Sequence, residues 1–66
     1  MIVKINGQDS ELNSNTTLEN FLKSNNYDTT KIAVEKNGDI VPRATFDKVI
    51  LAAGDKLEIV TFVGGG

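Results

Sequence analysis

The residues best suited to chemistry are the last three of the sequence, Gly64, Gly65 and Gly66, which follow an apolar run from residue 57 to 63. We expect them to form a flexible C-terminal tail, because glycines have no side chains to bury. The one functional group of such a tail is the Gly66 carboxylate, ionised at neutral pH, which ATP-dependent adenylation would convert into an acyl donor. Three extended residues reach roughly 10 Å, enough to enter a narrow channel in another protein. A plain disordered terminus or a linker is the alternative.

Other chemistry is limited by what the chain lacks. With no cysteine and no histidine, the chain has no thiolate nucleophile, no Ser-His or Cys-His pair and no tight zinc site. Two carboxylate pairs, Asp9 with Glu11 and Asp47 with Asp55, are better read as solvated surface charge than as acid-base dyads or Mg²⁺ ligands. We therefore predict no catalytic residue, no metal and no bound cofactor.

Size and charge narrow the class of protein further. A chain of 66 residues forms one domain with a small core and no room for a deep substrate cleft, so we expect no enzyme. The formal charge of -2, with both signs scattered along the chain, argues against a nucleic-acid partner. No apolar stretch predicts a membrane span or a signal peptide, and we expect a cytoplasmic monomer.

The first half of the chain predicts a hairpin and a helix. Residues 1–6 alternate in polarity as a half-buried strand does, Asn6-Gly7 is a strong hairpin signal, and residues 8–13 make a polar edge strand. Thr16 and Glu19 fit a capping box that opens a helix near Thr17, which Asn25 and its neighbour end.

The second half predicts more strands. Residues 32–36 form a strand, a tight turn at 37–39 leads into Ile40 and Val41, and Pro42 ends that short strand or places it at an edge. Residues 46–51 form a compact loop or short helical turn over the open end of the core. A turn at Gly54-Asp55 precedes the last strand, residues 56–63.

This order of elements predicts an α+β fold of the β-grasp, or ubiquitin-like, type over residues 1–63, with a tail at 64–66. We expect a mixed sheet of four to five strands with one main helix on one face. The first and last strands pair at its centre, and a right-handed crossover places the third strand parallel to the first. The predicted core consists of Val3, Ile5, Leu18, Phe21, Leu22, Val34, Leu57 and Ile59.

Two further features suggest partner binding. If Leu57 and Ile59 face the helix, alternation puts Val60 and Phe62 on the open face, where they form an apolar docking surface beside the tail. The alternative is that Phe62 folds against the sheet edge. Arg43, the single arginine, is able to dock an acidic surface, although an arginine in such a place more often holds a turn.

The segment from Asn37 to Arg43, N-G-D-I-V-P-R, resembles a motif of the ThiS family of sulfur-carrier proteins in thiamine biosynthesis. Asn6-Gly7, Thr17-Leu18, Gly54-Asp55 and the final Gly65-Gly66 are similar to that family too, over essentially the whole chain. Each signal is weak alone, because N-G and G-D merely make turns, but together they are specific.

The resemblance implies a carrier whose Gly66 carboxylate is the modified group. An activating enzyme of the ThiF type would adenylate it with ATP, and a sulfur donor such as a cysteine desulfurase system would supply the sulfur of a thiocarboxylate. A thiazole synthase of the ThiG type would then use that sulfur to build the thiazole ring. Gly64, Gly65, Val60, Phe62 and Arg43 are the expected partner contacts. Alternatives are a carrier like the small subunit of molybdopterin synthase, a ubiquitin-like protein modifier and a plain interaction module.

Overall fold

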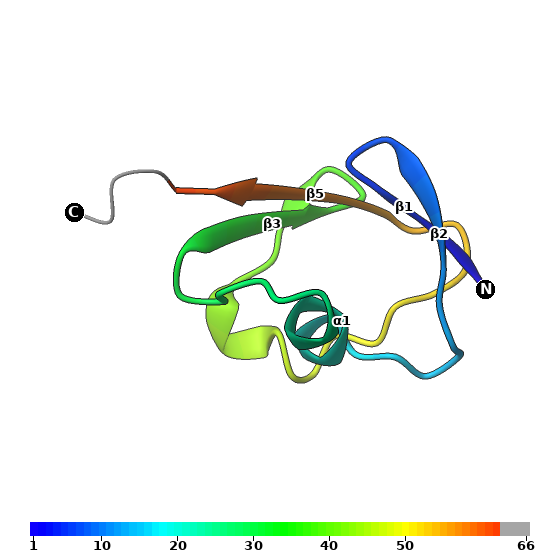
Figure 1. Ribbon diagram of the computed structural model, residues 1–66, viewed down its shortest axis with the longest axis horizontal. Helices are drawn as coiled ribbons and strands as arrows, with labels where there is room; N and C mark the ends of the chain where they lie inside the picture. The colour runs from blue at the N-terminus through cyan, green and yellow to red at the C-terminus, as the bar shows by residue number, and fades with distance from the viewer. Residues whose placement is uncertain (63–66) are drawn as a thin grey trace.

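The computed structural model describes residues 1–62, so the predicted glycine tail and Val63 lie outside the described residues. One mixed sheet has the strand order β2-β1-β5-β3-β4, and the α-helix crosses one of its faces (Figure 1). The predicted α+β architecture is confirmed. The elements are β1 (Ile2–Ile5), β2 (Gln8–Glu11), α1 (Leu18–Ser24), β3 (Ile32–Lys36), β4 (Asp39–Ile40), the 3₁₀ helix η1 (Arg43–Thr45) and β5 (Lys56–Thr61).

Two Asn-Gly turns make the hairpins. Asn6 and Gly7 have φ of 48° and 85°, and Asn37 and Gly38 have φ of 53° and 89°. Two consecutive residues with positive φ are typical of the type I′ turn, whose twist matches that of the strands it joins. Both predicted hairpins are confirmed, and β2 is an edge strand as expected, although it ends at Glu11 rather than at residue 13.

The helix begins one residue later than the predicted capping box requires. Thr17 is the N-cap, and its hydroxyl accepts a hydrogen bond from Asn20 N at 3.1 Å. The capping box from Thr16 to Glu19 is therefore wrong. The Thr16 hydroxyl instead donates to Asn13 O at 2.6 Å, and Glu19 forms an ion pair with Lys23 at 3.4 Å.

The direction of β3 also differs from the prediction. β1 runs parallel to β5, and β3 runs antiparallel to β5, so β3 is antiparallel to β1. The reason is the hairpin at Asn6-Gly7, which reverses the chain before it enters α1. The crossover through the helix thus joins β2 to β3, which share one direction. The expected central pairing of the first and last strands is confirmed.

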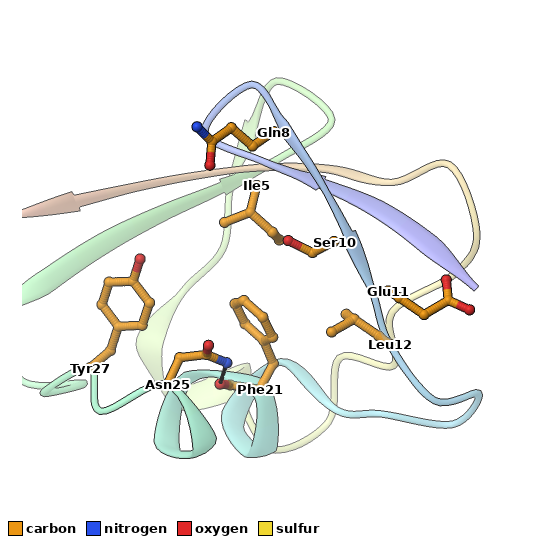
Figure 2. A pocket seen from close by; sticks show the side chains of 8 residues that line it. All are labelled: Ile5, Gln8, Ser10, Glu11, Leu12, Phe21, Asn25 and Tyr27. Atoms are coloured by element: carbon orange, nitrogen blue, oxygen red, sulfur yellow. Dashed lines mark hydrogen bonds between the residues drawn. The ribbon is translucent and has the colours of Figure 1, made fainter.

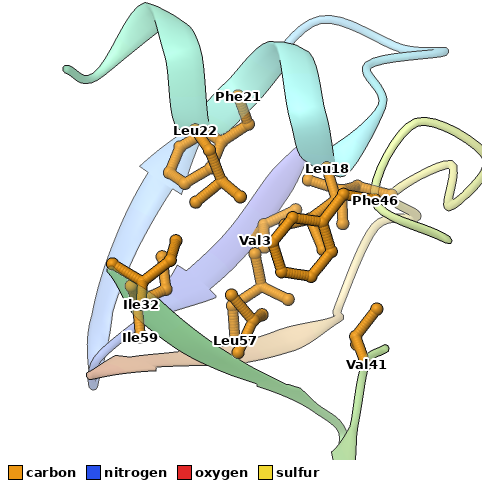
Figure 3. Close-up of a cluster of buried hydrophobic side chains, with 11 residues drawn as sticks. Val3, Leu18, Phe21, Leu22, Ile32, Val41, Phe46, Leu57 and Ile59 are labelled. Carbon is orange, nitrogen blue, oxygen red and sulfur yellow. The ribbon is translucent and has the colours of Figure 1, made fainter. Parts of the chain in front are cut away.

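The core lies between the sheet and α1 (Figure 3). All but one of the residues predicted for it are buried, and Ile5 is only partly buried against the cluster. Four further side chains complete it: Ile32, Val41, Phe46 and Leu51. Phe46 and Leu51 come from the segment after β4, which closes one end of the core as expected. No helix within residues 1–62 has the length and apolar character needed to span a membrane.

Candidate functional site

The last strand, β5, separates a buried face from an open one. Ile59 is 7% exposed, whereas Val60 and Phe62 are 57% and 54% exposed. The helix lies on the side of Ile59, and no element of the described chain covers the other side of the sheet (Figure 1). Val60 and Phe62 therefore stand where the alternation predicted, although their contact with a partner stays a prediction.

Other apolar side chains extend this surface. Val60 lies opposite Ala33 in the β3–β5 register, and Ile40, 75% exposed, lies opposite Glu35 on the same face. Ala33, Ile40 and Phe62 also line one hollow of about 260 Å³. We call Ala33, Ile40, Val60 and Phe62 the open-face patch. The contribution of Ile40 was not foreseen, because the predicted short strand of Ile40 and Val41 did not show which of the two side chains faces the core.

Two carboxylates border the open-face patch. Glu35 and Glu58 face one another directly across β3 and β5, and both are exposed. Like charges in directly opposed cross-strand positions destabilise a sheet. Neither forms one of the ion pairs of residues 1–62. Lys56 lines the same hollow as these two carboxylates, so the face beside the patch has charges of both signs.

The described chain leaves the sheet next to the start of β3. Thr61 lies opposite Ile32, and Phe62 N donates a hydrogen bond to Lys31 O at 2.8 Å. Val63 and the predicted site residues Gly64, Gly65 and Gly66 follow, outside the described residues. The open-face patch therefore lies directly beside the point from which these residues continue.

Arg43 has a clear structural role. Its Nε donates to Thr29 O at 2.7 Å, and its Nη2 donates to Ile32 O at 2.8 Å. The side chain thereby ties η1 to the segment that enters β3, which corresponds to the turn-holding alternative. A contact between Arg43 and a partner stays a prediction.

Asp55, considered above as half of a carboxylate pair, belongs to a hydrogen-bond network. Its carboxylate accepts from Asn37 Nδ2 at 3.0 Å and from Ala52 N at 2.8 Å, and Lys36 Nζ lies 3.9 Å away. Burial alone would raise the pKa of Asp55, but the Asn37 and Ala52 hydrogen bonds and the Lys36 charge together leave this pKa below its ordinary value. The network is structural, and sequence reasoning missed it.

A second concave region lies between β2 and α1 (Figure 2). Its volume is about 440 Å³, and its lining includes Gln8 and Ser10 above Phe21 and Tyr27 beside it. Ser10 has no histidine to activate it, because the chain contains none. Among residues 1–62 no three carboxylates gather as a metal site. The region therefore offers no recognisable catalytic arrangement.

The fold and the open-face patch define a class: a small protein of the β-grasp, ubiquitin-like type, with an apolar sheet face beside its C-terminal segment. The comparison with known families identifies the member of that class. The model of the ThiS family matches residues 3–66. The chain belongs to the ThiS family.

Individual relatives agree with this assignment. The sulfur carrier protein ThiS of Bacillus subtilis (strain 168) is 33% identical over 66 residues, covering 98% of this chain and all of that protein. The crystal structure of the thiamine biosynthesis protein ThiS from Geobacter metallireducens superposes over the full length of both chains with a TM-score of 0.85 and 28% identity.

A second group of relatives is much longer. A thiazole synthase of Paramagnetospirillum magneticum is 42% identical over 66 residues, which span all of this chain but 20% of that protein. A thiazole synthase of Magnetococcus marinus is 38% identical over the same length, which again covers 20% of that protein. The chain thus spans about a fifth of the thiazole synthases that it matches.

Proposed function

We propose that this protein is a sulfur carrier of thiamine biosynthesis, with the Gly66 carboxylate as the group that carries the sulfur. The match of the ThiS family model, which extends through Gly66, is the observation on which the proposal rests. The composition agrees, because a chain without cysteine or histidine has no side chain suited to bind or transfer sulfur itself. The protein is then a substrate of other enzymes rather than an enzyme.

The chemistry begins with activation of Gly66. A carboxylate oxygen attacks the α-phosphate of ATP on an adenylating enzyme, pyrophosphate leaves, and an acyl adenylate forms. The terminal sulfur of a persulfide, supplied by a desulfurase system, then attacks the acyl carbon and displaces AMP. A thiol cleaves the resulting acyl disulfide, takes the other sulfur into a new disulfide and leaves a thiocarboxylate on Gly66. The carrier needs no bound cofactor, and the ATP is consumed by the activating enzyme.

The open-face patch is the proposed docking surface for the activating enzyme. Phe62 and Val60 are apolar, exposed and next to the segment that must enter the partner's active site. Aromatic side chains near the centre of a contact supply much of its binding energy. Glu35, Glu58 and Lys56 beside the patch present charges of both signs, which can pair with complementary side chains of the partner.

Thiazole synthase is the proposed acceptor of the sulfur. The thiazole synthases from P. magneticum and M. marinus contain a stretch similar to the whole of this chain. A carrier-like segment within the same polypeptide as a thiazole synthase supports a partnership between the two. In this proposal the carrier acts in trans, because a glycine joined by a peptide bond to a following segment has no free carboxylate to adenylate.

Intact mass spectrometry tests the proposal and separates it from its alternatives. The protein is incubated with ATP, an activating enzyme, a persulfide donor and a thiol. A sulfur carrier gains the mass difference between sulfur and oxygen at Gly66, a protein modifier forms a lysine conjugate, and an interaction module is unchanged. Thiazole formation by a thiazole synthase supplied with the modified protein then distinguishes the thiamine pathway from molybdopterin synthesis. An unchanged mass under all conditions contradicts the proposal.

A further inference from the structure

One backbone hydrogen bond holds Phe62, the last described residue before the tail. Phe62 N donates to Lys31 O at 2.8 Å, beyond the last residue of β5. Lys31 lies outside the helices and strands, directly before β3. The Lys31 carbonyl therefore helps to hold the Phe62 backbone, the last described point before the tail.

Arg43 fixes the backbone on both sides of Lys31. Its Nε binds Thr29 O at 2.7 Å and its Nη2 binds Ile32 O at 2.8 Å. A guanidinium is planar and presents its N-H donors in a rigid arrangement, so these two bonds hold the two carbonyls at a set separation. Lysine, a point charge on a flexible stem, has no equivalent geometry.

Arg43 is itself anchored to the core. It opens η1, whose turn is closed by bonds from Thr45 N to Pro42 O at 2.9 Å and from Phe46 N to Arg43 O at 3.1 Å. Phe46 follows directly and is buried in the core. A set of contacts therefore runs from the core through η1 and Arg43 to the carbonyls of Thr29 and Ile32. Between these two lies Lys31, whose carbonyl accepts from Phe62 N.

We propose that Arg43 is a positioning residue for the C-terminal tail, acting through the segment 29–32 and the Phe62 N–H. It holds the Phe62 backbone, from which the chain continues toward the reactive carboxylate, in place beside the open-face patch. The proposal rests on the proposed function. It differs from a docking role, in which the Arg43 charge itself contacts an acidic partner surface, because both observed donors of the guanidinium serve carbonyls of this chain.

Two substitutions separate the two roles kinetically. Arg43→Gln removes the charge and the two bonds, and Arg43→Lys keeps the charge but loses the planar fork. Misplacement of a reacting group by about 1 Å costs on the order of 100-fold in rate. We therefore expect kcat of pyrophosphate exchange by the activating enzyme to fall roughly tenfold or more in both variants, with KM within about twofold of the parent. A raised KM with unchanged kcat, or full recovery in Arg43→Lys, would overturn the positioning role.

Amide hydrogen exchange gives a readout that does not depend on activity. In Arg43→Gln the Phe62 amide should exchange roughly tenfold faster or more, because the segment that carries its acceptor loses two hydrogen bonds. The Asn6 amide, which donates to Leu57 O at 2.9 Å, should keep its parent rate. Lys48→Gln is the matched control, since it removes one positive charge from an exposed side chain that forms no ion pair within residues 1–62.

A backbone change covers the case in which Arg43→Gln fails to fold. An ester in place of the peptide bond before Phe62 removes the Phe62 N–H and leaves Arg43 intact. It should reproduce the fall in kcat, and a parent-like kcat in this variant overturns the proposal. A Phe62 amide unchanged in a folded Arg43→Gln does so as well. Absence of exchange activity in the parent counts instead against the proposed function.

Discussion

Asn37, in the turn between β3 and β4, donates a side-chain hydrogen bond from Nδ2 to Oδ1 of Asp55, the residue directly before β5, at 3.0 Å. Asn37 Oδ1 also accepts from Lys56 N at 2.9 Å. One side chain of a tight turn thereby holds the start of β5, the strand that leads to the tail. The Asn37–Asp55 hydrogen bond thus links the turn at residue 37 to the strand that ends beside the proposed site.

This pair predicts a loss of stability in acid. The pKa of Asp55 is lowered from its ordinary value of 3.8 in the folded protein. The unfolded chain then binds the proton more readily, so the contribution is present above pH 3.8 and is lost as the pH falls through the lower folded value. Asp55→Asn should lose about 1 to 3 kcal/mol at neutral pH, because the amide has one acceptor oxygen, and one of the two donors, Asn37 Nδ2 or Ala52 N, then faces its NH₂ group.

Urea denaturation at several pH values measures this effect. The stability difference between parent and Asp55→Asn should shrink as the pH falls below 4, while a difference constant with pH would contradict the assignment. Asp28 is a second carboxylate whose pKa is lowered, by hydrogen bonds from the hydroxyl and amide of Thr30. It therefore adds to the acid dependence and needs a separate control. Asp28→Asn, at an exposed position, should flatten the acid dependence without the same loss at neutral pH.

Adjacent residues of β5 should differ sharply in their effect on stability. Ile59→Ala removes a buried side chain and should cost about 2 to 5 kcal/mol of unfolding free energy. Val60→Ala, on the open face, should cost less than about 1 kcal/mol. Thermal or urea unfolding of both variants gives the comparison. Equal losses would mean that Val60 is part of the core.

Phe62 should matter for binding more than for folding. Phe62→Asp places a charge in the open-face patch and should weaken capture by the activating enzyme roughly tenfold or more. Its circular dichroism spectrum and melting temperature should stay close to those of the parent, because the side chain is 54% exposed. Unfolding of this variant would instead show that the aromatic ring packs against the sheet.

The length of the tail should limit activation at Gly66. One residue spans about 3.3 to 3.6 Å, which is large compared with the tolerance of a reacting pair. Deleting Gly66 or adding an alanine after it should strongly lower pyrophosphate exchange without changing the melting temperature, and Gly64→Ala should be the mildest tail substitution. Full activity after deletion of both Gly65 and Gly66 would contradict the sulfur-carrier proposal.

The Glu35–Glu58 pair should cost stability. Glu58→Gln removes the like charge opposite Glu35 and should stabilise the fold by at most about 1 kcal/mol at low salt, the upper size of an exposed charge-charge interaction. The gain should shrink at high salt, where exposed charges are screened, and should vanish in a Glu35→Gln background. A gain that persists in that background has another origin. If the pair attracts a basic partner surface, the same variant binds the activating enzyme more slowly.

The sequence by itself determined the local features of this protein. Asn6-Gly7 and Asn37-Gly38 form the predicted hairpins, and β3 spans residues 32–36 as expected, because turn chemistry and side-chain alternation act over a few residues. The alternation of side chains along the last strand also placed Ile59 on the buried face and Val60 and Phe62 on the open face. The family resemblance, carried by motifs spread over the chain, led to the correct family.

Only the tertiary structure decided which distant segments meet. The direction of β3 relative to β1 depends on the hairpin that precedes the crossover. The helix cap fell on Thr17, which is held extended by a backbone bridge to Ile50. The acceptors of Arg43 are the backbone carbonyls of Thr29 and Ile32. Every residue has such a carbonyl, so no residue type marks these two as partners, and the support of the tail became visible only when the fold brought them together.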